Sequence, residues 1–360
     1  MELSSIPAND GFYFPAEFQP VSEVWLAWPE RKDNWRNQAL PAQQTFARIA
    51  NALADVTNVC IAVSNKQFER ARQSLNSQVR LVEIPYNDAW MRDIGPTVLV
   101  NDVGERRGIS WQFNAWGGSF NGLYGDWQQD ELVASSVCDI IGIDYYRAPF
   151  VLEGGAIHTD GEGTLYTTEE CLLSPGRNPQ LSKSDIERKL KEYLNIEKVI
   201  WLPKGLFNDE TDGHIDNLMH VIAPGKVVLS WTDDPSDPQY QLSREAEQTL
   251  RLQTDAKGRT IEVIRLPLPG PLHYSENEAN GIDGSEGMNR EAGERLSASY
   301  ANFLIVNGHV FLPLLDKKTD EKAIAILQQA MPDYQIIGIP SREVLLGGGN
   351  IHCITQQIPA

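Results

Sequence analysis

The sequence predicts a mixed α/β fold built from a repeated unit, and three observations lead to this prediction. Strand-like segments alternate with helix-like segments from one end of the chain to the other. One motif occurs twice, as EGGAIHTD at 153–160 and as GGGNIHCI at 347–354. No linker separates two halves, so residues 1–360 are predicted to form a single domain. A strand–strand–helix–strand unit that repeats around a ring would bring its glycine-led strand starts together at one centre.

The individual elements follow from hydrophobic spacing and turn residues. Helical spacing occurs at 41–55, 66–76, around 125–140, and at 182–194, 241–253 and 318–331. Apolar runs predict strands at 58–64, 79–84, 144–149, 198–202, 217–223, 226–231, 261–266, 302–307, 309–314, 334–339 and 350–356. Ser182 or Ser184 is the expected N-cap of the helix at 182–194. The irregular stretch 267–300 is predicted to be a surface loop and is a candidate cover for a site.

The composition narrows the class of protein. Hydrophobic residues make up 41% of the 360 residues, which is enough for a large core. Lysine and arginine number 31 against 49 acidic residues, a net charge of −18, which disfavours nucleic acid and anionic lipid and favours a cationic ligand. No signal peptide and no apolar run of ~20 residues is visible, so we expect a cytoplasmic protein that makes no membrane contact.

The four cysteines show no CxxC spacing, which argues against a disulfide framework and against a structural zinc site. Three of them have apolar neighbours and are interpreted as packing residues: Cys60, Cys138 and Cys171. Cys353 differs, because it follows GGGN and is flanked by polar side chains such as His352. It is a candidate nucleophile in its thiolate form, with a buried inert thiol as the alternative.

A nucleophile needs a partner that moves protons, and His214 is the best candidate. It lies in the acidic run NDETDGHIDN, where strand alternation would put His214 and Asp216 on one face. Such a face is costly to bury in an apolar core, so the pair is expected either to face solvent or to line a polar site. The other five histidines are weaker candidates, and most of them are predicted to be structural.

Further candidates lie near glycine turns. Asp93 follows Trp90 by three positions in NDAWMRDIGP, although Arg92 and Asp93 could instead form a surface ion pair. Glu153 opens EGG after an apolar run, so it is either a partnered buried carboxylate or lies at a strand edge. Trp116, in WQFNAWGGSFNG, could form a flat wall for a planar cation, or could pack in the core.

Together, one thiol, one imidazole, three carboxylates and indole rings describe a pocket for a planar cation. No HExxH motif, Walker loop or GxGxxG before a helix occurs, so no cofactor and no metal is expected for the chemistry.

As a set, these motifs resemble the agmatine deiminases of the guanidino-group-modifying (pentein) superfamily. The resemblance runs nearly end to end through FxxxFxPVSEVWLAWP, WMRDIGP, FNAWGG, LEGGAIHTDGEGTLYTTEECLLSPGRNP, NDETDGHIDN and GGGNIHCITQQIP. It implies a five-bladed, pseudo-symmetric α/β propeller of ββαβ units, in agreement with the repeat.

The resemblance also implies roles for the candidate residues. Cys353 would be the nucleophile and His214 the general acid and base. Asp93 and Asp216 would hold the guanidinium nitrogens, and Glu153 would orient His214 and stabilise its charge.

The remaining substrate contacts are implied less completely. Trp90 and Trp116 would line the slot for the guanidinium group. For the distal amine of the substrate, Asp212 is taken as the candidate, with Glu210 as the alternative.

The implied activity is hydrolysis of agmatine to N-carbamoylputrescine and ammonia through an amidino-thioether on Cys353, by a homodimer that serves polyamine biosynthesis. One alternative is a peptidylarginine deiminase, whose secreted forms carry a signal peptide. The other is a guanidine- or polyamine-binding protein without activity, which would need no nucleophile.

Overall fold

The computed structural model describes residues 1–284 and 290–360, and this part of the chain contains five separate β-sheets. The predicted mixed α/β class is confirmed, and none of the sheets in the described residues closes on itself. Two sheets have four strands, in the pairing order β1 (Glu2–Leu3), β7 (Tyr145–Val151), β6 (Arg106–Gln112), β5 (Thr97–Val100) and in the order β17 (Gln356–Pro359), β2 (Val21–Ala27), β3 (Asn58–Val63), β4 (Arg80–Glu83). Two sheets have three strands, in the order β10 (Lys198–Leu202), β9 (Thr164–Thr168), β8 (His158–Thr159) and in the order β11 (Met219–Ala223), β12 (Lys226–Trp231), β13 (Glu262–Pro267). The fifth sheet also has three strands, in the order β14 (Leu304–Val306), β15 (His309–Leu314), β16 (Gln335–Pro340).

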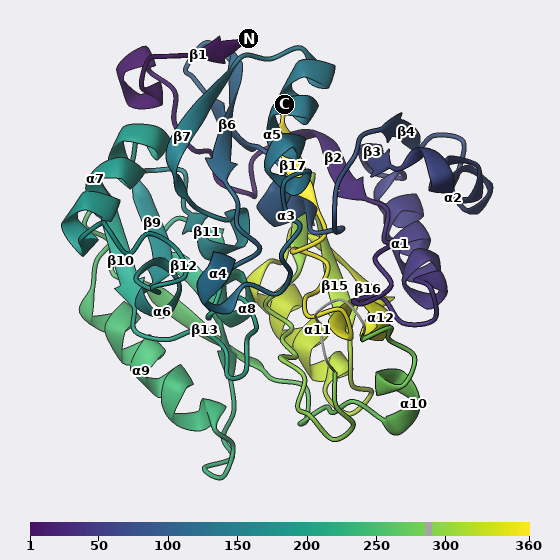
Figure 1. Ribbon diagram of the computed structural model, residues 1–360. Helices are drawn as coiled ribbons and strands as arrows, with labels where there is room; N and C mark the ends of the chain where they lie inside the picture. Colours follow the sequence, from purple (N-terminus) through teal and green to yellow (C-terminus); the bar gives the residue numbers. More distant parts are fainter. Residues whose placement is uncertain (285–289) are drawn as a thin grey trace.

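Each sheet contains the same connection. Two strands pair antiparallel, a helix follows, and the next strand returns parallel to the second one. The connecting helices are α5 (Asp130–Ile141), α7 (Lys183–Leu194), α9 (Gln239–Leu252), α11 (Asp320–Ala330) and α1 (Leu40–Leu53). The strand–strand–helix–strand unit predicted from the sequence therefore recurs in all five sheets. Figure 1 shows α1, α7 and α9 on the outside of the molecule.

A short helical turn or bend stands before the first strand of each unit. These segments are α3 (Met91–Ile94) before β5, the 3-10 helix η3 (Gly154–Ala156) before β8, α8 (Ile215–Leu218) before β11, a turn at 300–301 before β14, and a turn at 351–354 before β17. In Figure 1, α3 and α8 lie near the middle of the molecule. These five equivalent positions carry most of the candidate site residues.

The longer helices pack through one apolar face, as α7 illustrates. Ile186, Leu190 and Leu194 recur at four-residue spacing and are buried. Burying each of these side chains contributes roughly 1.5–3 kcal/mol relative to exposure. Ser182 is the N-cap, since its Oγ accepts the Asp185 N–H at 3.2 Å while the Asp185 carboxylate accepts the Ser182 N–H at 3.2 Å.

Two strand predictions near the candidate site are wrong. Residues 351–354 form a turn in which the Ile354 N–H donates to the Asn350 carbonyl at 3.2 Å, so β17 begins only at Gln356. His214 is the N-cap of α8, and Asp216 lies within that helix. The expected alternation of His214 and Asp216 on a strand face therefore does not apply. Short helical turns have no apolar period of their own, so these segments resemble extensions of the strands that follow.

The stretch 267–300 is mostly irregular, as predicted, but its described part contains α10 (Glu276–Ala279) and a bridge between His273 and Arg295. Residues 285–289 of the predicted loop lie outside the described residues. The other short elements are η1 (Pro7–Asp10), η2 (Asn65–Gln67), α2 (Phe68–Ser74), α4 (Gly118–Asn121), α6 (Glu169–Leu172) and α12 (Arg342–Leu345). In the described ranges, no helix combines the length and the apolar character needed to cross a membrane.

Candidate active site

Cys353 lies at the point where the turns before the strands converge. Its Sγ atom is 3.1 Å from Asn302 Nδ2, which donates to it, and 3.6 Å from Asp216 Oδ2. These residues precede β17, β14 and β11, so three units of the fold contribute one residue each. The thiol is only 6% exposed. The repeated connection of the fold therefore places distant parts of the sequence around one sulfur atom.

Gly155, which lies in η3, is surrounded by three polar side chains. A Cβ atom built on Gly155 would lie 2.5 Å from His214 Nδ1, 2.9 Å from Asp93 Oδ1 and 3.0 Å from Asp216 Oδ2. The sequence has glycine here because no larger residue fits between these groups. His214, Asp93 and Asp216 are thus brought together around Gly155.

Asp93 is held by two hydrogen bonds. The Gly155 N–H donates to its Oδ1 at 2.8 Å, and the Trp116 indole N–H donates to its Oδ2 at 2.9 Å. Burial raises the pKa of Asp93 to about 6; the charge of His214 lowers it, and the charges of Asp216 and Glu153 raise it further. A cation bound beside Asp93 would therefore stabilise the ionised form of its carboxylate.

His214 lies between two carboxylates without a close hydrogen bond to either. Its Nε2 is 3.7 Å from Glu153 Oε2, and its Nδ1 is 3.9 Å from Asp93 Oδ2. Burial alone would lower the pKa of His214, but Asp93, Cys171 and Glu153 raise it well above its usual value. The imidazole is thus a proton donor in the free protein.

Arg177 fixes Glu153 opposite His214. The Arg177 Nε–H donates to Glu153 Oε1 at 2.8 Å, and both side chains are fully buried. Burial would raise the pKa of Glu153, but the Arg177 guanidinium and His214 keep it below its usual value. Arg177 also donates to the Trp116 carbonyl, to the Thr211 carbonyl at 2.7 Å and to Asp212 at 2.9 Å. Arg177 thereby connects the buried Glu153 to the two segments that contain Trp116 and Thr211, both of which line the cavity.

Several buried polar atoms of the site have no hydrogen-bond partner among the described residues. They are both ring nitrogens of His214, Glu153 Oε2 and Asp216 Oδ1. An unpaired buried polar atom costs about 1–3 kcal/mol, and such groups are rare in folded proteins. Their concentration around Cys353 indicates a place where a polar ligand completes the hydrogen bonding.

The cavity above the thiol has aromatic and glycine walls. Its lining comprises Trp90, Asp93, Trp116, Leu123, Glu210, Thr211, Gly347, Gly348, Gly349 and Cys353. The Trp90 and Trp116 rings meet edge to face with centroids 6.4 Å apart. A Cβ atom on Gly349 would lie 2.6 Å from the Trp90 ring and 3.1 Å from Cys353 Sγ. The glycine run thus keeps a flat slot open between an indole and the thiol.

Trp116 adopts a positive φ of 63°, which is uncommon for a residue with a side chain. Its carbonyl accepts from Arg177 and its indole N–H donates to Asp93, and these two contacts hold it there. The backbone at this wall is thus maintained by residues of the site itself.

Burial raises the pKa of Cys353 well above its usual value, and the charges of Asp216 and Asp93 raise it further. The thiol is thus protonated in the free protein. A cation placed between Asp93 and Asp216 would offset the two negative charges that oppose the thiolate.

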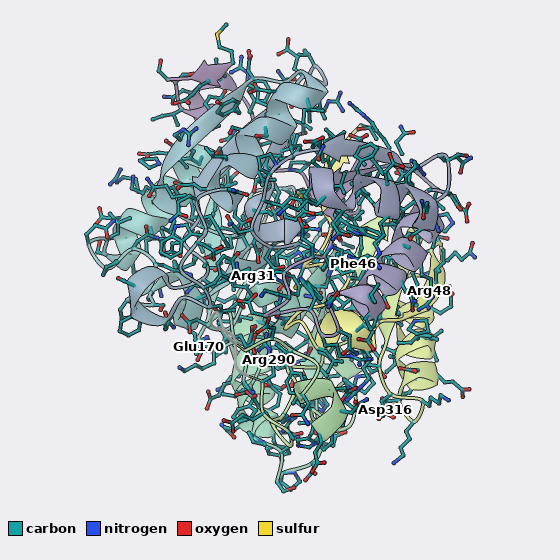
Figure 2. All side chains as sticks on the ribbon, turned by 45° about the vertical axis from the view of Figure 1, so that its right-hand side comes forward. Arg31, Phe46, Arg48, Glu170, Arg290 and Asp316 are labelled. Carbon is teal, nitrogen blue, oxygen red and sulfur yellow. The ribbon has the colours of Figure 1, made fainter. Side chains whose placement is uncertain are left out.

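The two residues proposed for the substrate amine occupy different surroundings. Asp212 accepts from Arg177, from Ser174 at 3.0 Å and from Asn121 at 3.0 Å, and it is not part of the cavity lining. Glu210 does line the cavity and forms an ion pair with Arg290, which is labelled in Figure 2. The role of Asp212 in substrate binding stays a prediction.

The sequence analysis missed Asn302 and Arg177. Asn302 holds the thiol, and its Oδ1 also accepts the backbone N–H groups of His352 and Cys353 at 3.1 and 3.3 Å. It lies just before β14, in a segment without a motif of its own. Arg177 lies in a loop with no such signal.

The fold and the site define a mixed α/β protein in which a buried thiol, an imidazole and three carboxylates surround a narrow cavity. The model of the Porphyromonas-type peptidyl-arginine deiminase family matches residues 13–359, so the chain belongs to this family. The resemblance expected from the motifs is thereby confirmed.

Individual relatives extend this comparison. A Vibrio parahaemolyticus protein is 83% identical over 360 residues, covering 100% of both chains, and a Photobacterium profundum protein is 58% identical over 358 residues, covering 99% of each. Both carry the name "Putative agmatine deiminase". The structure of the agmatine deiminase of Enterococcus faecalis matches with a TM-score of 0.96 and 47% identity, over 99% of this chain and 98% of that one. A cysteine-to-serine variant of the C. jejuni agmatine deiminase, with substrate bound, matches with a TM-score of 0.83 and 27% identity, over 96% of both.

Proposed function

We propose that this protein hydrolyses agmatine to N-carbamoylputrescine and ammonia. The observation that carries the proposal is the Cys353 thiol beside Asp93 and Asp216 at the base of a slot with indole walls, where buried polar atoms lack partners. The names of the two relatives and of the Enterococcus faecalis structure support the same reaction.

The first step is fixation of the guanidinium group. Its plane fits between the indole walls, and the carboxylates of Asp93 and Asp216 accept its N–H groups in charge-assisted hydrogen bonds. The orientation brings the central carbon to the Cys353 sulfur and reduces the entropy lost in the reaction. The bound cation also lowers the free energy needed to form the thiolate.

Once the cation is bound, the Cys353 thiol loses its proton to solvent, and the resulting thiolate attacks the guanidinium carbon to form a tetrahedral adduct. His214 donates a proton to one amino group, which leaves as ammonia, so that an amidino-thioether remains on Cys353. His214 next takes a proton from water, which attacks the same carbon. The carbon–sulfur bond breaks, the hydroxyl proton of the adduct passes to the departing sulfur, and the neutral ureido product leaves with the thiol restored. Glu153, held by Arg177, stabilises the imidazolium form of His214.

The cavity also favours a cationic substrate tail over a carboxylate. Asp93 and Glu210 contribute carboxylates to its lining, and no Lys or Arg is among the described lining residues. Glu210, which lies nearer to this cavity than the Arg177-bound Asp212, is the better candidate to bind the ammonium group of agmatine.

A comparison of substrates tests this proposal. Ammonia release is measured with agmatine, free arginine and an arginine peptide at equal concentration, and we expect agmatine to give by far the highest kcat/KM. Faster release from the peptide would favour a peptidylarginine deiminase instead. Tight binding of agmatine without ammonia release would favour a binding protein.

We also propose that the five units form a single domain, arranged as a five-bladed pseudo-symmetric propeller around the site. We further propose that the protein is a homodimer in the cytoplasm that needs no cofactor. Sedimentation of the full chain would distinguish the dimer from a monomer.

A further inference from the structure

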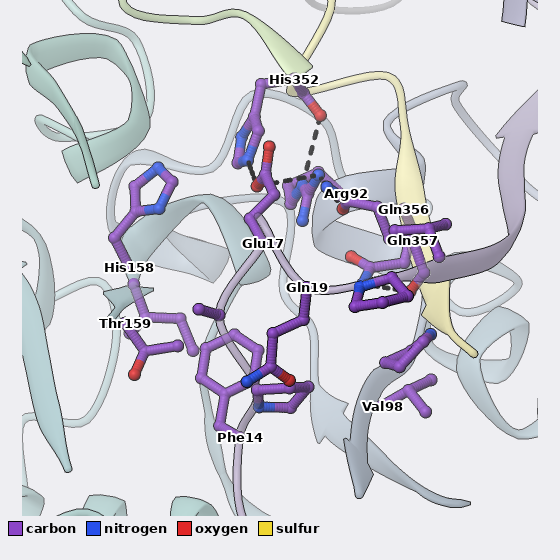
Figure 3. A pocket seen from close by; sticks show the side chains of 16 residues that line it. Phe14, Glu17, Gln19, Arg92, Val98, His158, Thr159, His352, Gln356 and Gln357 are labelled. Carbon is purple, nitrogen blue, oxygen red and sulfur yellow. Dashed lines mark hydrogen bonds and ion pairs between the residues drawn. The ribbon is translucent and has the colours of Figure 1, made fainter. Parts of the chain in front are cut away.

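A second cluster of buried polar side chains lies beside the active site and belongs to no linear motif. It consists of Glu17, His158, His220 and His352, each of which places one possible ligand atom within 4.8 Å of the others. Figure 3 shows Glu17, His158 and His352 around one pocket. The three histidines are at most 4% exposed. The proposed reaction uses none of these four side chains.

In His352 and His220, the Nδ1 atom points away from the centre of the cluster and contacts a group that can only accept a hydrogen bond. His352 Nδ1 lies 2.8 Å from Asp216 Oδ2, and His220 Nδ1 lies 3.2 Å from the Ala301 carbonyl. Each Nδ1 atom therefore carries the proton, and in the neutral ring Nε2 carries a lone pair. Such outer contacts are typical of histidines that bind a metal.

The Nε2 atoms of the three histidines either face the Glu17 carboxylate or lack a hydrogen-bond partner among the described residues. His352 Nε2 is 2.8 Å from Glu17 Oε2, and His220 Nε2 is 3.2 Å from Glu17 Oε1. His158 Nε2 has no hydrogen-bond partner among the described residues. Lone pairs that face a carboxylate repel it, so a cation is required between them, either a proton on each ring or one metal ion.

Other charges near the cluster leave room for a cation. Glu17 Oε1 accepts the Ile305 N–H at 2.9 Å, and Arg92 Nη2 is 3.9 Å from Glu17 Oε2. Arg92 itself donates to Gln357 at 2.7 Å and to the His352 carbonyl at 3.2 Å, so it is directed past the carboxylate. The carboxylates of Glu17 and Asp216 supply two negative charges.

We propose that Glu17, His158, His220 and His352 bind one divalent transition-metal ion of the zinc type. Three imidazoles and one carboxylate form a nitrogen–oxygen ligand set that suits Zn²⁺, whereas Ca²⁺ and Mg²⁺ prefer oxygen ligands. Tetrahedral ligands about 2.0–2.1 Å from Zn²⁺ are roughly 3.3 Å apart. The contacts of His352 and His220 with Glu17 are of similar length, 2.8 Å to Oε2 and 3.2 Å to Oε1. With four protein ligands, the ion has no open position and is structural.

The ion would connect three sheets. His158 lies on β8, His220 on β11, and His352 in the turn before β17, while Glu17 lies in the segment before β2. Through His352 the ion would also fix Asp216. This site does not depend on the proposed reaction, because metal binding can be measured without any substrate.

Metal titration of the full chain tests the proposal. Protein treated with a chelator is dialysed against Co²⁺ alone or Zn²⁺ alone, and we expect one ion per chain. The Co²⁺ protein should show visible d–d bands without a thiolate charge-transfer band, and Cys353→Ala should leave this spectrum unchanged. His158→Asn and Glu17→Gln should weaken binding at least about tenfold. His309→Asn, which alters a histidine outside the cluster, is the matched control and should bind normally.

Thermal unfolding provides a second measurement for variants of reduced stability. Zn²⁺ should raise the Tm of the wild type and of His309→Asn, and should leave the Tm of Glu17→Gln unchanged. Absence of a bound ion in the wild type would overturn the proposal. So would a thiolate band that disappears in Cys353→Ala, or equal affinity in His158→Asn and the wild type.

Discussion

Burial determines the protonation state of each group around Cys353. The thiol and Asp93 both have pKa values above their usual range, because water is excluded and neighbouring carboxylates oppose their ionisation. The pKa of His214 is also raised, although burial alone would lower it, because Asp93 and Glu153 favour its protonated form. The free site thus contains a neutral thiol and a charged imidazole, and a bound cation is what makes the thiolate accessible.

The pKa of Asp93 predicts how substrate binding depends on pH. An acid whose pKa is raised to about 6 is ionised above that value and protonated below it. The guanidinium binds to the ionised form, so its affinity should fall about tenfold per pH unit as pH decreases below about 6. Calorimetry with agmatine and the Cys353→Ala variant would measure this without turnover. Affinity that stays constant down to about pH 5 would contradict the role of Asp93.

Gly155 allows a test of geometry. In Gly155→Ala the new methyl group would meet His214, Asp93 and Asp216 within 3.0 Å, so all three side chains must move. A displacement of about 1 Å reduces catalysis roughly 10²-fold, and we expect at least this loss in kcat/KM. Gly125→Ala is the matched control, since no atom lies within 4 Å of its Cβ position. Similar activity in the two variants would show that the three groups need not converge.

At the scale of elements, the sequence predicted regular structure well and the turns between elements poorly. The amphipathic helices and the apolar strands have clear periods, and α7, β10, β12 and β15 agree with their predicted bounds to within one residue. The turns before β11 and β17 have no period, so they were predicted as strands. The candidate residues could still be named because their motifs are specific, whereas Asn302 lies in a segment without one.

The cluster around Glu17 illustrates a related limit. Its four members come from four segments of the chain, and none has a second ligand nearby in the sequence. Motifs for metal sites depend on ligands at short spacing, so a cluster made only by the arrangement of sheets has no linear signal.

The N-cap of α7 allows a test of local stability. Removal of the Ser182 hydroxyl in Ser182→Ala leaves the Asp185 N–H without its partner and should lower the free energy of unfolding by about 1 kcal/mol. Urea denaturation would measure this change, and activity should be unaffected. Ser184→Ala, two residues away and inside the helix, should cost less than half as much. A larger cost for Ser184→Ala would mean that the helix begins elsewhere.

For the whole molecule, five repeats of one connection explain why so many polar groups meet at one place. Each unit contributes the turn before its first strand, so residues as far apart in the sequence as Asp93 and Cys353 meet without a long loop to bring them together. The net charge of −18 favours approach of a cationic substrate, and this long-range attraction weakens with salt. Whether the assembled site performs covalent chemistry depends on one atom, the sulfur of Cys353.

The most direct measurement is therefore ammonia release from agmatine by the wild type, by Cys353→Ala and by Cys60→Ala. Cys60 is a buried thiol on β3, and burial raises its pKa as it does for Cys353, but it lies away from the site. We expect steady ammonia release by the wild type and by Cys60→Ala, and none by a Cys353→Ala protein whose circular dichroism matches the wild type. Undiminished release by Cys353→Ala would contradict the account.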